Sequence, residues 1–155
     1  MKLQDILKDS NYSLDLFSKQ SIENLENKII EKIDKKGKVY YCVNCIIRNK
    51  EIKLTPEEIV RQLYTETLIS VYGYSKERIA FEYPIYFGRE TKRADIVIRD
   101  ADDASVAYII VEVKKRKPKM AENNLNHTHM RQVQVWQSGL MNDNSILPTK
   151  DPQLF

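Results

Sequence analysis

The chain contains few of the residues that build disulfide scaffolds or zinc modules. Its 155 residues include two cysteines and two histidines. Cys42 and Cys45 form one C-x-x-C, whereas a structural zinc site takes four ligands. The two histidines, His127 and His129, lie far along the chain. We therefore expect both cysteines to be ordinary strand residues.

Long apolar runs are also missing. No run reaches the roughly eighteen apolar residues of a membrane span. The first residues carry acids and lack the apolar centre of a signal peptide, which predicts a cytoplasmic protein without a membrane partner. The sequence has no G-x-x-x-x-G-K-S/T loop, so we expect any movement along DNA to depend on another chain or a further segment.

Positive charge is modest in total but clustered. The formal net charge is +3. The cluster and the cations just upstream of it comprise Lys114, Lys115, Arg116, Lys117, Lys119, Arg89, Lys92 and Arg93. Such a cluster is either a solvated loop or a patch that contacts phosphates.

The first 36 residues are polar and helix-prone. Apolar side chains recur there at helical spacing, and Ser21 is a candidate cap; the recurring residues are Ile22, Leu25, Ile29, Ile30 and Ile33. The pattern predicts an N-terminal helical extension over residues 1–36, followed by the main domain over residues 37–155.

The main domain opens with the predicted strand "KVYYCVNCIIR" and a short return strand in "NKEIKL". A helix then begins after the cap Thr55, with Pro56 in its first turn and Glu58 completing a capping box. Gly73 ends this helix. Its expected buried stripe consists of Val60, Leu63, Thr67, Leu68 and Val71.

Three more strands follow. "RIAFEYPIYF" contains Pro84, which favours an edge position. "ADIVIRD" and "VAYIIVEVKK" are separated by a short turn, and the second is apolar on both faces, as expected of a central strand. We expect an α/β fold with a mixed central sheet flanked by helices.

Charged residues lie at the adjacent ends of the last two strands. An antiparallel hairpin would bring Asp95 beside Glu112, and Lys114 would share a face with Glu112. Two close carboxylates repel each other unless a cation lies between them. Mg²⁺ suits Asp95, Glu112 and the carbonyl of Val113 as ligands, and Lys114 would steady an attacking water. The alternative is a surface salt bridge between Glu112 and Lys114.

These residues carry a family resemblance. The stretch from "YYCVNC" to "ADIVIRD", together with "YIIVEVKKRKPKM", resembles the PD-(D/E)XK nucleases, and within them the N-terminal domain of type I restriction enzyme R subunits. The resemblance covers residues 38–121. It implies a restriction-endonuclease-like fold, a domain at residues 37–155, and hydrolysis of double-stranded DNA with Mg²⁺, for which Mn²⁺ can substitute.

The resemblance also implies roles for residues. Asp95 and Glu112 would bind the metal and Lys114 would be the catalytic lysine. Family members often add a helix glutamate near an E-x-x-R-Q pattern, which is Glu58 here, with Glu66 as the alternative. Phosphate contacts would come from Lys92, Arg93, Lys115 and Arg116, and other restriction-modification subunits are expected partners.

The chain departs from the family after the lysine. Family members continue into a helix with Q-x-x-x-Y and a strand ending near V-W-T-N. Here Gln132 and Trp136 match that pattern poorly, and the alternation of Val133 and Val135 predicts a strand. We hypothesise that residues 122–141 are a frameshifted version of the family segment; the alternative is ordinary divergence.

Two functional hypotheses follow. The first is a Mg²⁺-dependent endonuclease domain of restriction type. The second is a non-catalytic DNA-binding or assembly module that has kept the fold. Because a frameshifted tail would lack the family's glutamine and tyrosine, we expect weak or absent cleavage by the isolated chain.

The gene tests the frame hypothesis. Codons 122–141, read from their third base, are expected to encode a segment close to KQLKSYTHATGAGVAVWTN, which contains both missing motifs. Nucleotide sequencing checks this, and codons that do not permit that reading would refute the hypothesis.

Overall fold

The computed structural model describes residues 2–87, 89–113 and 133–137. Its helices are α1 (Leu3–Leu7), α2 (Lys19–Glu26) and α3 (Pro56–Ser70), with a 3-10 turn at Lys76–Arg78. Its strands are β1 (Ile30–Ile33), β2 (Val39–Cys45), β3 (Lys50–Lys53), β4 (Ile79–Phe87), β5 (Glu90–Arg99), β6 (Ala107–Val113) and β7 (Val133–Gln137).

The strands form two sheets. One has the order β1-β2-β3 and the other the order β4-β5-β6-β7. The expected α/β class is confirmed, and the arrangement is compatible with a mixed restriction-endonuclease-like fold. Within the described ranges every strand pair is antiparallel, so the parallel pairs of a mixed sheet do not occur in that part of the chain.

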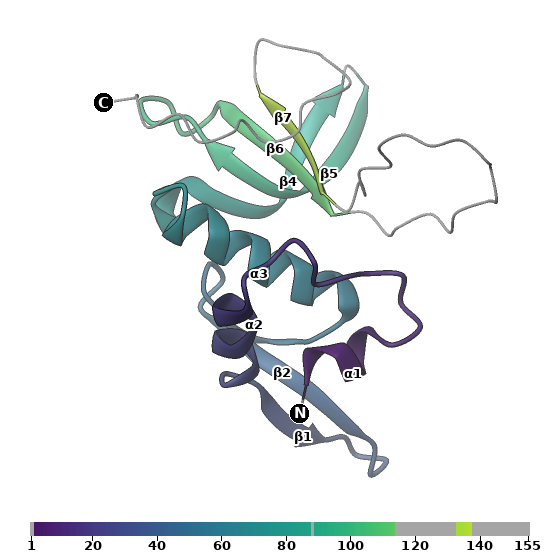
Figure 1. Ribbon diagram of the computed structural model, residues 1–155. Coiled ribbons are helices and arrows are strands. Elements are labelled where there is room, and N and C mark those ends of the chain that lie inside the picture. The colour runs from purple at the N-terminus through teal and green to yellow at the C-terminus, as the bar shows by residue number, and fades with distance from the viewer. Residues whose placement is uncertain (1, 88, 114–132, 138–155) are drawn as a thin grey trace, which may run out of the picture.

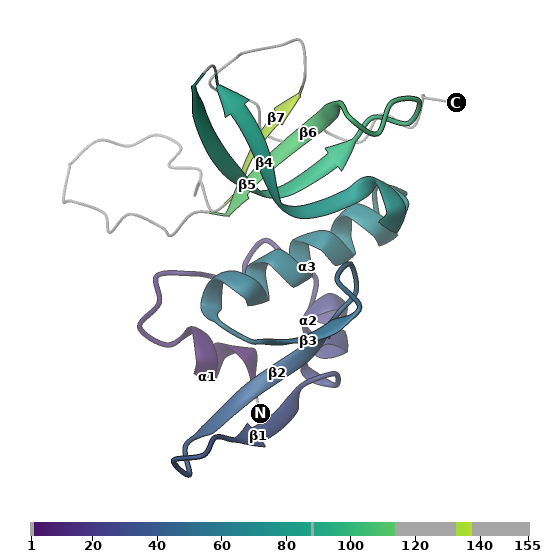
Figure 2. The ribbon, with the colours of Figure 1, turned by 180° about the vertical axis from the view of Figure 1, so that it is seen from behind.

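Helix α3 lies between the two sheets (Figures 1 and 2). Ile59 and Leu63 pack into a core with α1, α2 and the small sheet. Tyr64 and Leu68 pack into a second core beneath the larger sheet. A helix covered on two sides has few solvent-facing positions, so its polar residues are buried as well.

The start of α3 follows the prediction. The Thr55 hydroxyl accepts a hydrogen bond of 3.2 Å from the backbone N–H of Glu58, and Pro56 is the first helical residue. The Glu58 carboxylate accepts hydrogen bonds from Arg61 and Gln62, which lie later in α3. These bonds replace the one to the Thr55 backbone N–H that a capping box would require. Val71, expected in the buried stripe, is 65 % exposed because α3 has already ended.

The N-terminal region corrects the sequence prediction. Helix α2 begins after the cap Ser18, whose hydroxyl accepts from the Ser21 N–H, so Ser21 lies inside the helix. The segment Ile30–Ile33 is a strand paired with β2, and the helical reading of Ile30 and Ile33 is wrong. The boundary expected at residue 36 falls in the turn that joins these two paired strands.

The remaining strand predictions are confirmed. The segments around Cys42, Ile52 and Pro84 are strands, and Pro84 lies in β4 at an edge of the larger sheet. The alternation of Val133 and Val135 marks β7, which pairs with β6. None of the helices among the described residues has the length and apolar character to cross a membrane.

Candidate functional site

Asp95 and Glu112 lie on neighbouring strands. Strand β5 pairs antiparallel with β6, and Ile96 is the partner of Val111. One further step along this register places Asp95 opposite Glu112. The Asp95 Oδ2 accepts a hydrogen bond of 2.7 Å from the backbone N–H of Val113, which fixes the carboxylate at the end of β6.

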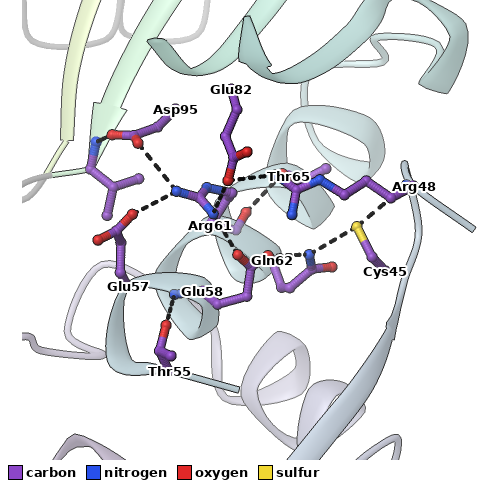
Figure 3. A network of polar contacts seen from close by, with 11 residues as sticks. Cys45, Arg48, Thr55, Glu57, Glu58, Arg61, Gln62, Thr65, Glu82 and Asp95 are labelled. Atoms are coloured by element: carbon purple, nitrogen blue, oxygen red, sulfur yellow. Dashed lines mark hydrogen bonds and ion pairs between the residues drawn. The ribbon is translucent and has the colours of Figure 1, made fainter. Parts of the chain in front are cut away.

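Arg61 of α3 reaches the same carboxylate. Its Nη2 lies 3.2 Å from Asp95 Oδ1 and 2.6 Å from Glu57 Oε1, and its Nη1 lies 2.5 Å from Glu58 Oε2 (Figure 3). The side chain is only 5 % exposed. One buried guanidinium therefore joins three carboxylates and ties α3 to β5.

Electrostatics keep Arg61 charged. Burial opposes its charge, but the carboxylates of Glu58, Asp95 and Glu57 outweigh this and raise the pKa of Arg61 above its ordinary value. Their negative charge also reaches the N-terminal segment. There, partial burial together with the negative charges of Glu57 and Asp95 raises the pKa of Tyr12 above its ordinary value.

Glu58 is held apart from the Asp95–Glu112 pair. Its Oε1 accepts a bond of 2.8 Å from Gln62, and its Oε2 accepts from Arg61. The Gln62 amide also lies 3.3 Å from the sulfur of Cys45, a buried free thiol in β2. In this arrangement Glu58 orients Arg61, and the E-x-x-R-Q pattern is one hydrogen-bonded unit on α3.

A second arginine extends the network. Arg48, in the turn after β2, lies 2.9 Å from Glu82 Oε1, which is also 4.0 Å from Arg61. Glu82 has φ +52°, a left-handed conformation that is costly for a residue other than glycine inside a strand. Both guanidiniums lie over the Phe81 ring, at 5.2 and 5.9 Å from its centroid. The edge strand β4 is thus fastened to the network at Glu82.

The donor set at Asp95 and Glu112 fits Mg²⁺. Each carboxylate oxygen has two lone pairs, so Asp95 keeps one on each oxygen after bonding Val113 and Arg61. Mg²⁺ takes one or two carboxylates and retains several waters. Within residues 2–87, 89–113 and 133–137, no group of three or more His, Cys, Asp or Glu side chains is placed to hold a metal, so the fit rests on two carboxylates and water.

The other predicted site residues have different settings. Lys92 and Arg93 are exposed on β5, just before Asp95. Glu66, the alternative helix glutamate, accepts a bond of 3.4 Å from Asn24 of α2 and so belongs to another part of α3. Lys114, Lys115 and Arg116 lie outside the described residues.

Sequence reasoning assigned no role to several residues of the network, among them Arg61, Glu57 and Glu82. Arg61 was visible only as a letter of the E-x-x-R-Q pattern, and its burial depends on packing by both sheets. Glu57 adjoins the expected Glu58 and carried no signal of its own. Glu82 stands out in the structure by its left-handed backbone conformation, and no sequence pattern predicted that conformation.

The buried ion pair predicts an unequal response to two substitutions. Arg61→Gln leaves the Glu58 carboxylate buried without its cation, and we expect the free energy of unfolding to fall by about 3–5 kcal/mol. Glu57→Gln removes a half-exposed partner of the same guanidinium and is expected to cost at most about 1 kcal/mol. Urea unfolding measures both, and equal losses would contradict the arrangement.

Comparison with known protein families identifies the family of this chain. A family model for the type I restriction enzyme R protein N-terminus matches residues 56–139, which is more than half of the chain and includes Glu58, Asp95 and Glu112. Neither curated proteins nor solved structures give a match. The family match supports a role in a restriction system, and the chain belongs to the type I restriction enzyme R protein N-terminus family.

Proposed function

We propose that this domain hydrolyses DNA phosphodiester bonds with Mg²⁺ bound at Asp95 and Glu112. The observation that carries the proposal is the bond from the Val113 N–H to Asp95, which holds that carboxylate beside the end of β6. The β5–β6 register ends at the pair Ile96 and Val111, and its continuation by one step supports Glu112 as the neighbour of Asp95. Family membership adds the restriction context, in which double-stranded DNA and other restriction-modification subunits are the partners.

Charge around the site favours a divalent cation. Among the described residues, the carboxylates of Glu57, Glu58, Glu82 and Asp95 form ion pairs with two guanidiniums, those of Arg61 and Arg48. Two negative charges are left over in this network before Glu112 is counted. A dication placed at the Asp95–Glu112 end would balance them at close range.

Each residue has a defined task in the proposed reaction. Bound Mg²⁺ supplies polarisation of the phosphate and a more acidic water. Asp95 is held in place by Val113 and Arg61, so it needs little reordering when it becomes a ligand. Glu112 and the Val113 carbonyl complete the protein ligands, and Lys114 stabilises charge on the attacking water. Glu58 acts through Arg61 as a positioning residue.

Calorimetric titration with Mn²⁺ tests the metal site, because Mn²⁺ accepts the same oxygen ligands. We expect saturable binding to the wild-type chain and loss of detectable binding in Glu112→Ala. Glu66→Ala is the matched control, since Glu66 faces α2 and is expected to leave binding unchanged.

Two outcomes would overturn the proposal. Equal binding by wild type and Glu112→Ala would place the metal elsewhere. No binding by any folded variant would favour the second hypothesis, a non-catalytic module that has kept the nuclease fold.

A further inference from the structure

The hairpin of β4 and β5 extends beyond the rest of its sheet. Pairing of β4 with β5 continues to Phe87 and Glu90, whereas β5 pairs with β6 only from Ile96 onward. Residues 83–87 and 89–93 therefore form a two-stranded ribbon, which we call the arm. The ends of β4 and β5 that form the arm rise at the upper edge of the larger sheet, away from α3 (Figures 1 and 2).

The arm exposes an aromatic residue among cations. Tyr86 is 74 % exposed, more than any other exposed large hydrophobic side chain among the described residues. Arg89, Lys92 and Arg93 are exposed close to it, against the single acid Glu90. A lone exposed tyrosine needs no explanation. An exposed tyrosine on a projecting ribbon that also carries three cations matches the chemistry of a polyanion that offers apolar and hydrogen-bonding edges.

The strand register places one face of the arm on the same side of β5 as Asp95. Tyr86 pairs with Thr91 and Pro84 pairs with Arg93, so these four side chains share a face. Two residues further along β5, the same face carries Asp95. At about 3.4 Å per residue, Arg93 lies roughly 7 Å along the strand from Asp95. A DNA backbone that contacts Arg93 would therefore also pass close to Asp95.

The base of the arm is fixed to the network. Glu82 immediately precedes the arm and is held 2.9 Å from Arg48. The Phe81 ring, beside Glu82, lies beneath both arginines. These contacts hold the base of the arm beside Arg61, which also bonds Asp95.

We propose that the arm enters the major groove of double-stranded DNA. The major groove, about 12 Å wide, admits a two-stranded ribbon. Tyr86 contacts base edges, while Arg93 contacts a phosphate on the site-facing side and Lys92 contacts one on the opposite side. This inference rests on the proposed function, because it names how the same site holds its DNA.

Fluorescence anisotropy with a labelled duplex, without divalent metal and at several salt concentrations, tests the arm. Arg93→Gln is expected to weaken binding and to reduce the salt slope by about 1, the value for one lost phosphate contact. Tyr86→Ala is expected to weaken binding at least about fivefold with an unchanged slope, because it removes a contact that releases no counterion.

Controls come from the opposite end of the sheet. Lys76→Gln and Tyr72→Ala remove a cation and a partly exposed aromatic residue before β4 begins, and both are expected to bind as wild type. If Tyr86→Ala and Arg93→Gln both bind DNA with wild-type affinity, the proposal that the arm enters the major groove is wrong. The proposed function would still be tested separately by the Mn²⁺ titration. Absence of duplex binding by the wild-type chain would also refute the proposal that the arm binds DNA.

Discussion

The buried charge of Arg61 is the constraint on which the rest of the site depends. A guanidinium between two sheets is stable only if carboxylates surround it, and here they come from α3 and from β5. Glu58 and Asp95 are therefore held at defined places before any ligand arrives. Glu82 of the edge strand lies 4.0 Å from the same guanidinium and 2.9 Å from that of Arg48. A helix, a sheet and the arm are joined by one network.

This network separates two kinds of acid that look alike in the sequence. Glu58 is buried, and both its oxygens accept bonds from side chains of α3. Asp95 is partly exposed and keeps lone pairs for a ligand. It lies in the middle of β5, which begins five residues earlier at Glu90, so the expectation that Asp95 opens its strand is wrong. The first is suited to positioning and the second to coordination. The family pattern names both residues, but their surroundings give them different chemical uses.

Local sequence patterns predicted the features that depend on residues close together in the chain, such as strand pairing across a short turn and helix caps. The two-residue period and the short turn predicted the antiparallel pairing of β5 with β6, which the structure confirms. The cap Thr55 and the edge residue Pro84 were also recognised. Long-range packing decided the rest. Ile30 and Ile33 fit a helical spacing, yet pairing with β2 makes them a strand. Arg61 is buried because sheets cover both sides of α3, which no pattern within α3 reveals. The frame hypothesis and the role of Lys114 stay predictions.

The central claim is that a divalent metal binds between β5 and β6. The most direct measurement is an anomalous difference map from a crystal of the wild-type chain soaked in Mn²⁺. The account predicts a peak bridging the carboxylates of Asp95 and Glu112, at oxygen distances of about 2.0–2.3 Å. A peak on other residues, or none at these two carboxylates in a well-ordered soaked crystal, would contradict it.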